Sequence, residues 1–268
     1  MYSEYKTILV EVENGLCTLT LNRPEVRNAI NSTMLKELND FFAKAKDDPE
    51  VRALVITGAG KGFSSGADLG EWDEVNESGG EDSDMEGAQW VVWGHNMMTS
   101  LKNFPKPVIA AVNGAAAGAG CDMALAADVR YGSTNAKFGE AYVNVGYCPD
   151  NGGTYLLPRV VGWSKAAEMI FTGDLVKAEE ALAIGLITHL TTPEELLNEA
   201  KAFAQRLAQG PTVAIGQSKL LLAKSWYNEF EAQLDEEGKA GEVCQATEDS
   251  LEAVKAFAER RAPVFKGR

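Results

Sequence analysis

The stretch VIAAVNGAAAGAGCDMALAAD, residues 108–128, restricts the fold more than any other part of this 268-residue chain. Almost all of its side chains are small, and small side chains let neighbouring backbones approach closely, as in the G-x-x-x-G pattern of paired membrane helices. A membrane-spanning helix would be richer in leucine, isoleucine and phenylalanine, and would not carry Asn113 and Asp122. The stretch therefore predicts a buried strand, a turn and a tightly packed helix.

Strand and helix patterns alternate on both sides of this stretch. Residues 7–21 alternate apolar and polar around Asn14-Gly15, which is the strongest short-range signal of a β-hairpin. Apolar spacing predicts further elements: a helix within 31–50 with Asn31 or Ser32 as its N-cap, a helix over 88–104, and buried strands over 51–58, 108–114 and 128–132. Such alternation indicates an α/β fold.

The pattern changes toward the C-terminus. From Trp163 to Arg261 it is almost wholly helical. A chain of 268 residues is long enough to bury one sizeable core. We therefore divide it into an α/β core with the substrate site, residues 1–190, and a helical C-terminal region for oligomerisation, residues 191–268.

The formal charge of -14 at pH 7 argues against two classes of partner. Nucleic acids and anionic membranes both attract proteins through a basic surface field, so we expect neither as a partner. The four cysteines form no C-x-x-C pair, and only His95 and His189 offer nitrogen ligands, so we expect no disulfide framework and no metal site. The N-terminus has no basic segment followed by an apolar run, which favours a reducing, cytoplasmic setting.

Two unusual segments separate the predicted strand at 51–58 from the next helix. The glycine-rich residues 58–70 follow a strand as a nucleotide-binding loop would, but Phe63 replaces the last glycine of G-x-G-x-x-G and no G-x-x-x-x-G-K-[ST] register exists. Their backbone amides can still approach a ligand. Residues 71–86 include eight acidic and no basic side chains, which predicts a solvated, mobile loop.

A combined signature is carried by four segments: NRPEVRNAI (22–30), FSSGAD (63–68), NGAAAGAGCDMALAAD (113–128) and PDNGGTYLLPRVVG (149–162). Their wording, order and spacing resemble the crotonase superfamily, also called the enoyl-CoA hydratase/isomerase family, over almost the whole chain. The resemblance implies a spiral of ββα units with a helical C-terminal trimerisation region, assembled as a homotrimer or a dimer of trimers. It also implies an acyl-CoA thioester substrate, with coenzyme A as part of the substrate and no separate cofactor.

The resemblance further implies an oxyanion hole made by the backbone N–H groups of Ser65 and Ala119. Two preorganised amides, one of them near a helix N-terminus, stabilise the charge of a thioester enolate. Taken alone, the small residues around Ala119 also fit helix packing without a catalytic role. The matching substrate-binding positions are Val26, Arg27, Ala29, Ser64, Gly66, Ala67, Asp68, Leu69, Gly118, Tyr142 and Lys266. Arg27 and Lys266 are the candidates for the CoA phosphates, or else ordinary solvated surface charges.

Family members that hydrate enoyl-CoA use two glutamates on one water molecule. The first position matches Asp122, which is shorter by one methylene, and the second matches Tyr142. A tyrosine, with an ordinary pKa of about 10, is a poor base at neutral pH. Glu140 is two residues away, and its register is expected to place it elsewhere. Asp122 is either a second acid or base, or a carboxylate satisfied by backbone amides at a helix N-terminus.

Asp150, in YCPDNGGTYLLPR, matches the catalytic aspartate of dienoyl-CoA isomerases and of epoxyphenylacetyl-CoA isomerases, and the motif wording is most similar to the latter. By itself, Pro-Asp-Asn-Gly is also ordinary turn chemistry. A carboxylate that faces an apolar pocket has a raised pKa, which suits removal of a weakly acidic proton. The resemblance therefore favours an isomerase in which Asp150 shuttles a proton to shift a double bond while the oxyanion hole holds the dienolate.

Three other functions stay open. An enoyl-CoA hydratase would add water to a 2-enoyl-CoA. A hydrolase similar to 4-chlorobenzoyl-CoA dehalogenase would use Asp150 as the nucleophile and His95 as the base, although Tyr142 stands where that branch has a tryptophan. A catalytically inactive relative would only bind CoA esters. The acyl pocket is expected to be walled by Trp90, Trp93, Met97 and Met98, which fit a core-facing helix equally well.

Overall fold

The computed structural model describes residues 2, 4–71 and 81–268, with the backbone alone for 81–88. Most of the predicted acidic loop, residues 71–86, therefore lies outside the described residues. Its last part is helical, because α3 (Glu81–Lys102) begins at residue 81 rather than at the predicted residue 88. The prediction of a loop is wrong for 81–86, whose backbone is helical.

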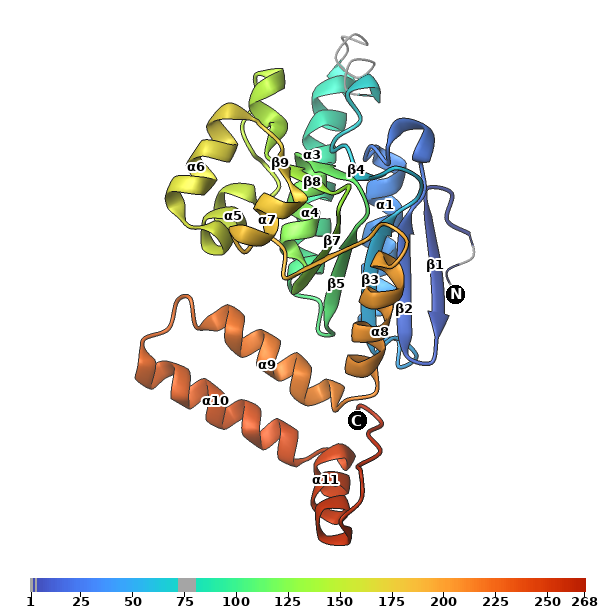
Figure 1. Ribbon diagram of the computed structural model, residues 1–268, viewed down its shortest axis with the longest axis vertical. Helices are drawn as coiled ribbons and strands as arrows, with labels where there is room; N and C mark the ends of the chain where they lie inside the picture. The colour runs from blue at the N-terminus through green and yellow to red at the C-terminus, as the bar shows by residue number, and fades with distance from the viewer. Residues whose placement is uncertain (1, 3, 72–80) are drawn as a thin grey trace.

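Six strands form one sheet in the order β1-β2-β3-β5-β7-β10 (Figure 1). The predicted hairpin is confirmed: β1 (Ile8–Glu13) and β2 (Leu16–Leu21) pair antiparallel around Asn14 and Gly15, both at positive φ. All later neighbours pair in parallel. The parallel strands are β3 (Ala53–Gly58), β5 (Val108–Val112), β7 (Val129–Ser133) and β10 (His189–Thr191).

A second sheet has the order β4-β6-β8-β9. Its strands are β4 (Gly62–Ser64), β6 (Ala115–Ala117), β8 (Lys137–Gly139) and β9 (Val176–Lys177). β4, β6 and β8 follow β3, β5 and β7 within a few residues, so each passage of the chain adds one strand to each sheet. This arrangement is the spiral of ββα units that the resemblance implied. Strands of two or three residues are too short for periodicity to predict.

Helices surround the two sheets (Figure 1). Besides α3 they are α1 (Ser32–Ala45), α4 (Ala119–Ala126), α5 (Gly153–Val161), α6 (Trp163–Thr172), α7 (Ala178–Ala183) and α8 (Leu196–Ala208). Two short 3-10 segments, η1 (Pro24–Val26) and η2 (Ala141–Val145), lie near the site described below. The helix α5 was not predicted, because it begins inside the glycine-containing PDNGG turn.

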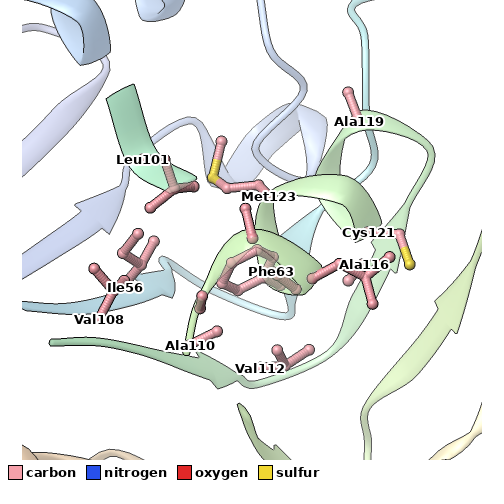
Figure 2. Close-up of a cluster of buried hydrophobic side chains, with 14 of the residues drawn as sticks. Ile56, Phe63, Leu101, Val108, Ala110, Val112, Ala116, Ala119, Cys121 and Met123 are labelled. Carbon is pink, nitrogen blue, oxygen red and sulfur yellow. The ribbon is translucent and has the colours of Figure 1, made fainter. Parts of the chain in front are cut away.

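The small-residue stretch forms the centre of the molecule. It folds as β5, β6 and α4, which confirms the predicted strand, turn and helix. Every residue of α4 is buried, and Met123 packs among Phe63, Leu101 and neighbouring side chains (Figure 2). A β-carbon on Gly120 would lie 2.5 Å from the Ser64 carbonyl oxygen, so only glycine permits this approach. Among the described residues, no helix is long and apolar enough to cross a membrane.

The C-terminal helices behave in two ways. Helix α8 packs Leu196, Ala200 and Ala204 against the buried residues of β3 and β5, so the sheet-bearing part of the chain continues through α8. Beyond it, α9 (Thr212–Lys224), α10 (Phe230–Gln245) and α11 (Glu248–Glu259) extend away from the sheets (Figure 1). We call residues 212–268 the C-terminal arm. The division at residue 190 stays a prediction, and the packing of α8 favours a later boundary.

Candidate active site

The turn after β4 lies against the segment that follows η1. The Ile30 N–H donates to the Gly66 carbonyl at 2.8 Å, and the Asp68 N–H donates to the Ile30 carbonyl at 2.9 Å. Ala67, between these two bonds, pairs with Ile30 as a parallel bridge, so its own N–H points to the opposite side. Among the described residues, the Ala67 N–H has no acceptor.

The Ser65 N–H, by contrast, is already paired. It donates to the Arg27 carbonyl at 3.0 Å, and the Ser65 hydroxyl donates to the Val26 carbonyl at 3.2 Å. It is therefore not free to hold a thioester oxygen, and the prediction for Ser65 is corrected: the unpaired amide of this turn belongs to Ala67. Successive amides of an extended segment face opposite sides, and motif matching alone does not reveal which side faces a ligand.

A second unpaired amide lies at the start of α4. Gly118 precedes the helix with φ 51°, and Ala119 is the first helical residue. The Ala119 N–H has no acceptor in the described part of the chain, as is usual for the first turn of a helix. A β-carbon on Gly66 would lie 2.8 Å from the Ala117 carbonyl oxygen and 3.5 Å from the Ala119 nitrogen. The turn and the helix start are thus in contact.

Two side chains that the sequence did not single out hold this turn in place. Asn28 is buried at positive φ, and its Nδ2 donates to the carbonyls of Gly62 at 2.9 Å and Phe63 at 3.1 Å. Arg23 donates from Nη1 to Asp68 Oδ2 at 2.7 Å. Asp68, which was predicted to bind substrate, therefore makes an internal ion pair that fixes the end of the turn.

Asp122 and Tyr142, which match the two hydratase glutamates, form one pair. Asp122 is fully buried, and its Oδ2 accepts a hydrogen bond from the Tyr142 hydroxyl at 2.5 Å. Burial raises the pKa of Asp122, the Tyr142 hydrogen bond lowers it, and the charge of Asp150 raises it again. Burial and the charge of Asp122 raise the pKa of Tyr142 far above its ordinary value, so Tyr142 is a proton donor. A β-carbon on Gly118 would lie 3.7 Å from the Tyr142 ring.

Glu140 lies next to Asp122. The expectation that its register places it elsewhere is therefore wrong. Glu140 is fully buried directly before η2, where the chain turns. Its Oε2 and Asp122 Oδ1 each lie 2.5 Å from the point that a β-carbon on Gly153 would occupy. Neither Asp122 Oδ1 nor either Glu140 oxygen has a hydrogen-bond partner among the described residues. Asp122 is therefore not satisfied by helix amides, which removes that alternative.

Asp150 lies half-buried in the loop before α5. Its Oδ1 accepts a hydrogen bond from Asn151 Nδ2 at 2.6 Å. Burial raises the pKa of Asp150, while the Asn151 hydrogen bond and the charge of His95 lower it in part. Nε2 of His95, on α3, lies 2.8 Å from the Asp150 carbonyl oxygen and donates to it, so this nitrogen fixes the loop rather than serving as a base.

The remaining predicted residues around the turn divide into two groups. Ala29 and Ser64 are buried, and the Ser64 hydroxyl donates to the Asn28 carbonyl at 2.8 Å, so both support the turn. Val26, Arg27 and Leu69 are exposed at its rim, and Arg27 has no ion-pair partner among the described residues.

Lys266 is not brought to this site by its own chain. It lines a cavity of ≈ 290 Å³ on the C-terminal arm, and its Nζ lies 3.6 Å from Glu248 Oε2. The arm and the turn after β4 occupy opposite ends of the molecule (Figure 1). The four side chains proposed for the acyl pocket contribute to the core: Met97 and Met98 are buried in it, and Trp90 and Trp93 pack against it.

Comparison with known proteins agrees with this geometry. A family model described as enoyl-CoA hydratase/isomerase matches residues 11–268. The chain belongs to the enoyl-CoA hydratase/isomerase family. It is 39% identical over 259 residues to the short-chain-enoyl-CoA hydratase of Clostridium acetobutylicum, covering 96% of this chain and 97% of that protein. It is 37% identical over 261 residues to the 1,2-epoxyphenylacetyl-CoA isomerase of Escherichia coli, covering 97% and 98%.

The fold of the family is also confirmed by solved structures. The crystal structure of an enoyl-CoA hydratase from Bacillus anthracis matches with a TM-score of 0.90 and 30% identity, covering 98% of this chain and 100% of that one. Membership of the enoyl-CoA hydratase/isomerase family identifies the protein as an enzyme of the hydratase/isomerase type acting on acyl-CoA. The crotonase resemblance stated from the four sequence segments is therefore confirmed.

In an enzyme of this family the arrangement divides into three parts. The adjacent unpaired N–H groups of Ala67 and Ala119 can both donate to one oxygen atom. Asp150 offers a carboxylate that is only half-buried. Asp122, Tyr142 and Glu140 form a buried acidic group behind them. Sequence reasoning missed Arg23, Asn28 and Asn151 and placed Glu140 away from the site. Of the three missed residues only Asn28 gave a local signal, because asparagine is enriched at positive φ.

Proposed function

We propose that this enzyme shifts a carbon–carbon double bond in an enoyl-CoA, with Asp150 as the acid and base. One observation carries the proposal. Tyr142 stands at the position of the second hydratase glutamate, and its hydroxyl donates a hydrogen bond to Asp122, so it cannot serve as a base. Of the carboxylates Asp122, Glu140 and Asp150, Asp150 is then the one that is not fully buried. Burial raises its pKa toward the range useful for proton transfer.

The thioester oxygen would be held by the N–H groups of Ala67 and Ala119. Both amides are unpaired among the described residues, and the segments that carry them are in contact. Amides fixed in advance stabilise the charge of an enolate without reorganising during the reaction. The α4 N-terminus adds its positive end to the same position.

The proton shuttle has two steps. Asp150 removes a proton from the carbon α or γ to the thioester, and the electron pair moves into a dienolate whose negative oxygen rests on the two amides. The protonated Asp150 then returns the proton to the other carbon, which moves the double bond and restores the carboxylate. Asn151 keeps Asp150 Oδ1 in a fixed orientation through its 2.6 Å hydrogen bond.

Hydration of a 2-enoyl-CoA is the second candidate. It is favoured by the 39% identity to a protein named as a short-chain-enoyl-CoA hydratase, and by the raised pKa of the buried Asp122, which suits an acid. The dehalogenase-like hydrolase has less support, because His95 Nε2 donates to a backbone carbonyl. An inactive CoA-ester binder would not need the acidic group at all.

We further propose that the working form is a homotrimer or a dimer of trimers. Exposed apolar side chains on the C-terminal arm, among them Trp226, Phe230 and Phe257, support association with further copies of this chain. Arg27, exposed at the rim of the turn, would bind a CoA phosphate, and Lys266 would reach such a site only through that assembly. Coenzyme A enters as part of the substrate, with no separate cofactor. All four cysteines are free thiols, which supports a reducing, cytoplasmic location.

The test is a paired assay of the enzyme against a 3-enoyl-CoA and a trans-2-enoyl-CoA in deuterated water, read by NMR. We expect the two double-bond positions to interconvert, and Asp150→Asn to slow this by about 10² to 10⁴-fold. Asp47→Asn, at a carboxylate 81% exposed and remote from the site, is the matched control. Formation of 3-hydroxyacyl-CoA without a double-bond shift would instead identify a hydratase.

A further inference from the structure

Glu140 has no role in the proton shuttle, yet it is buried against Asp122, a carboxyl on which the charge of Asp150 acts. Asp122 and Glu140 are both fully buried. Three of their four carboxyl oxygens have no hydrogen-bond partner among the described residues. Asp122 Oδ1 and Glu140 Oε2 converge on one point over Gly153, each 2.5 Å from it, so they are no more than about 5 Å apart. Two buried carboxylates at this separation do not both ionise at neutral pH.

The surroundings indicate which of the two holds the proton. Asp122 Oδ2 accepts the Tyr142 hydroxyl, and Asp122 lies in the first turn of α4, so two features stabilise its negative charge. Glu140 has neither feature. Its pKa is raised by burial first and by the charge of Asp122 second, while the Cys121 thiol lowers it in part.

Other charged groups around the pair do not change this assignment. Asp150 carries a negative charge that acts on Asp122. Arg130 is a buried cation that interacts with Cys121, but its Nε and Nη1 donate to the carbonyls of Leu186 and Ala127 rather than to a carboxylate. Within the described part of the chain no cationic side chain pairs with these carboxyls, so a proton is what neutralises the pair.

We propose that Glu140 is a positioning residue that stays protonated and donates to Asp122 Oδ1, holding Asp122 ionised and fixed in orientation beside Tyr142. The pair then carries one proton and one negative charge as a unit. The consequence for catalysis rests on the proposed function, with Asp122 added as a second acid or base beside Asp150. The protonation of Glu140 itself does not depend on the proposed function.

Two substitutions separate the donor from the charge. Glu140→Gln keeps a donor of similar size and cannot ionise, whereas Glu140→Met removes the donor. We expect Glu140→Met to raise the pKa of the acid limb of kcat/KM by about one unit and to lower turnover about tenfold near that limb, because Asp122 loses its hydrogen bond in a dry site. Glu140→Gln should keep both the pKa of the acid limb and the turnover close to the wild-type values.

The sign of the shift decides between the alternatives. If Glu140 were ionised in the working enzyme, both variants would lower the pKa of the acid limb, because a like charge is removed from Asp122. If Glu140 were only structural, neither variant would move the limb. In an Asp122→Asn background, Glu140→Met should add no further change, and an additional loss would show that Glu140 acts on something other than Asp122.

A measurement without substrate keeps this inference distinct from the proposed function. A pKa raised in the folded state, above about 4.3 in the unfolded chain, means that the folded protein binds the extra proton and loses stability as pH rises. The Tm of the unliganded enzyme should therefore fall relative to that of Glu140→Gln by about 3 °C or more between pH 6 and pH 9. Equal slopes for both proteins would overturn the inference, and failure of the isomerase assay alone would not.

Discussion

The α/β part and the C-terminal arm treat their apolar side chains differently. In the α/β part many of the large ones are enclosed, among them Phe41, Phe63 and Leu38, although α6 leaves Trp163 79% and Phe171 74% exposed. On the arm they remain outside, with Phe257 88% and Leu222 71% exposed. One chain thus encloses the core of the α/β part, whereas all three helices of the arm present apolar side chains at the surface.

This difference is what the proposed assembly predicts, because further copies of the chain would cover the arm. Burial of apolar area contributes about 25 cal/mol per Å², so exposed side chains on three consecutive helices are surface that association would stabilise. On α11 the exposed residues Leu251, Val254 and Phe257 follow one another at intervals of three, which puts them on one side of the helix. The arm is the part of the molecule that the proposed assembly would cover.

The largest effect that would sharpen this contrast is expected at Phe257. Phe257→Glu places a charge on the apolar side of α11 and should weaken association by about 2–4 kcal/mol per interface, with the α/β part still folded. Sedimentation at several concentrations, with circular dichroism, measures both. Lys255→Glu on the same helix is the matched control for charge. A mutant that keeps the mass of the wild-type assembly would refute a role for this side of α11.

A smaller effect is expected inside the α/β part, at Gly120. The β-carbon of Gly120→Ala would lie 2.5 Å from the Ser64 carbonyl oxygen and 2.8 Å from the Ser64 β-carbon, and backbone atoms cannot yield cheaply. We expect the free energy of unfolding to fall by about 3 kcal/mol, at the upper end for overpacking, together with a loss of activity. Denaturant unfolding provides the measurement. A stability unchanged within error would mean that β4 and α4 are less tightly packed than described.

The smallest effect is expected from the equivalent change on the arm. A β-carbon on Gly238, in α10, meets nothing within 4 Å in this chain. Gly238→Ala should therefore stabilise the protein by up to about 1 kcal/mol through helix propensity. Thermal unfolding measured at the same protein concentration as the wild type tests this. A loss of stability would break the contrast at this position, because it would mean that the assembly covers Gly238.

Local patterns in the sequence were enough for most of the framework. The alternation around Asn14-Gly15 predicted β1 and β2, and the small residues 108–128 predicted β5 and α4. The second sheet was missed, since β4, β6 and β8 have three residues each and gain their stability from pairing with distant segments rather than from their own periodicity.

The site shows the same division. The sequence by itself determined the family and brought Asp122, Tyr142 and Asp150 into consideration, because these positions lie within motifs that can be matched residue by residue. Only the tertiary structure decided that the Ser65 amide is paired while that of Ala67 is not, and that Glu140 lies against Asp122. The physical reason is that an amide's partner and a carboxylate's neighbour are set by contacts between distant segments, about which local periodicity holds no information.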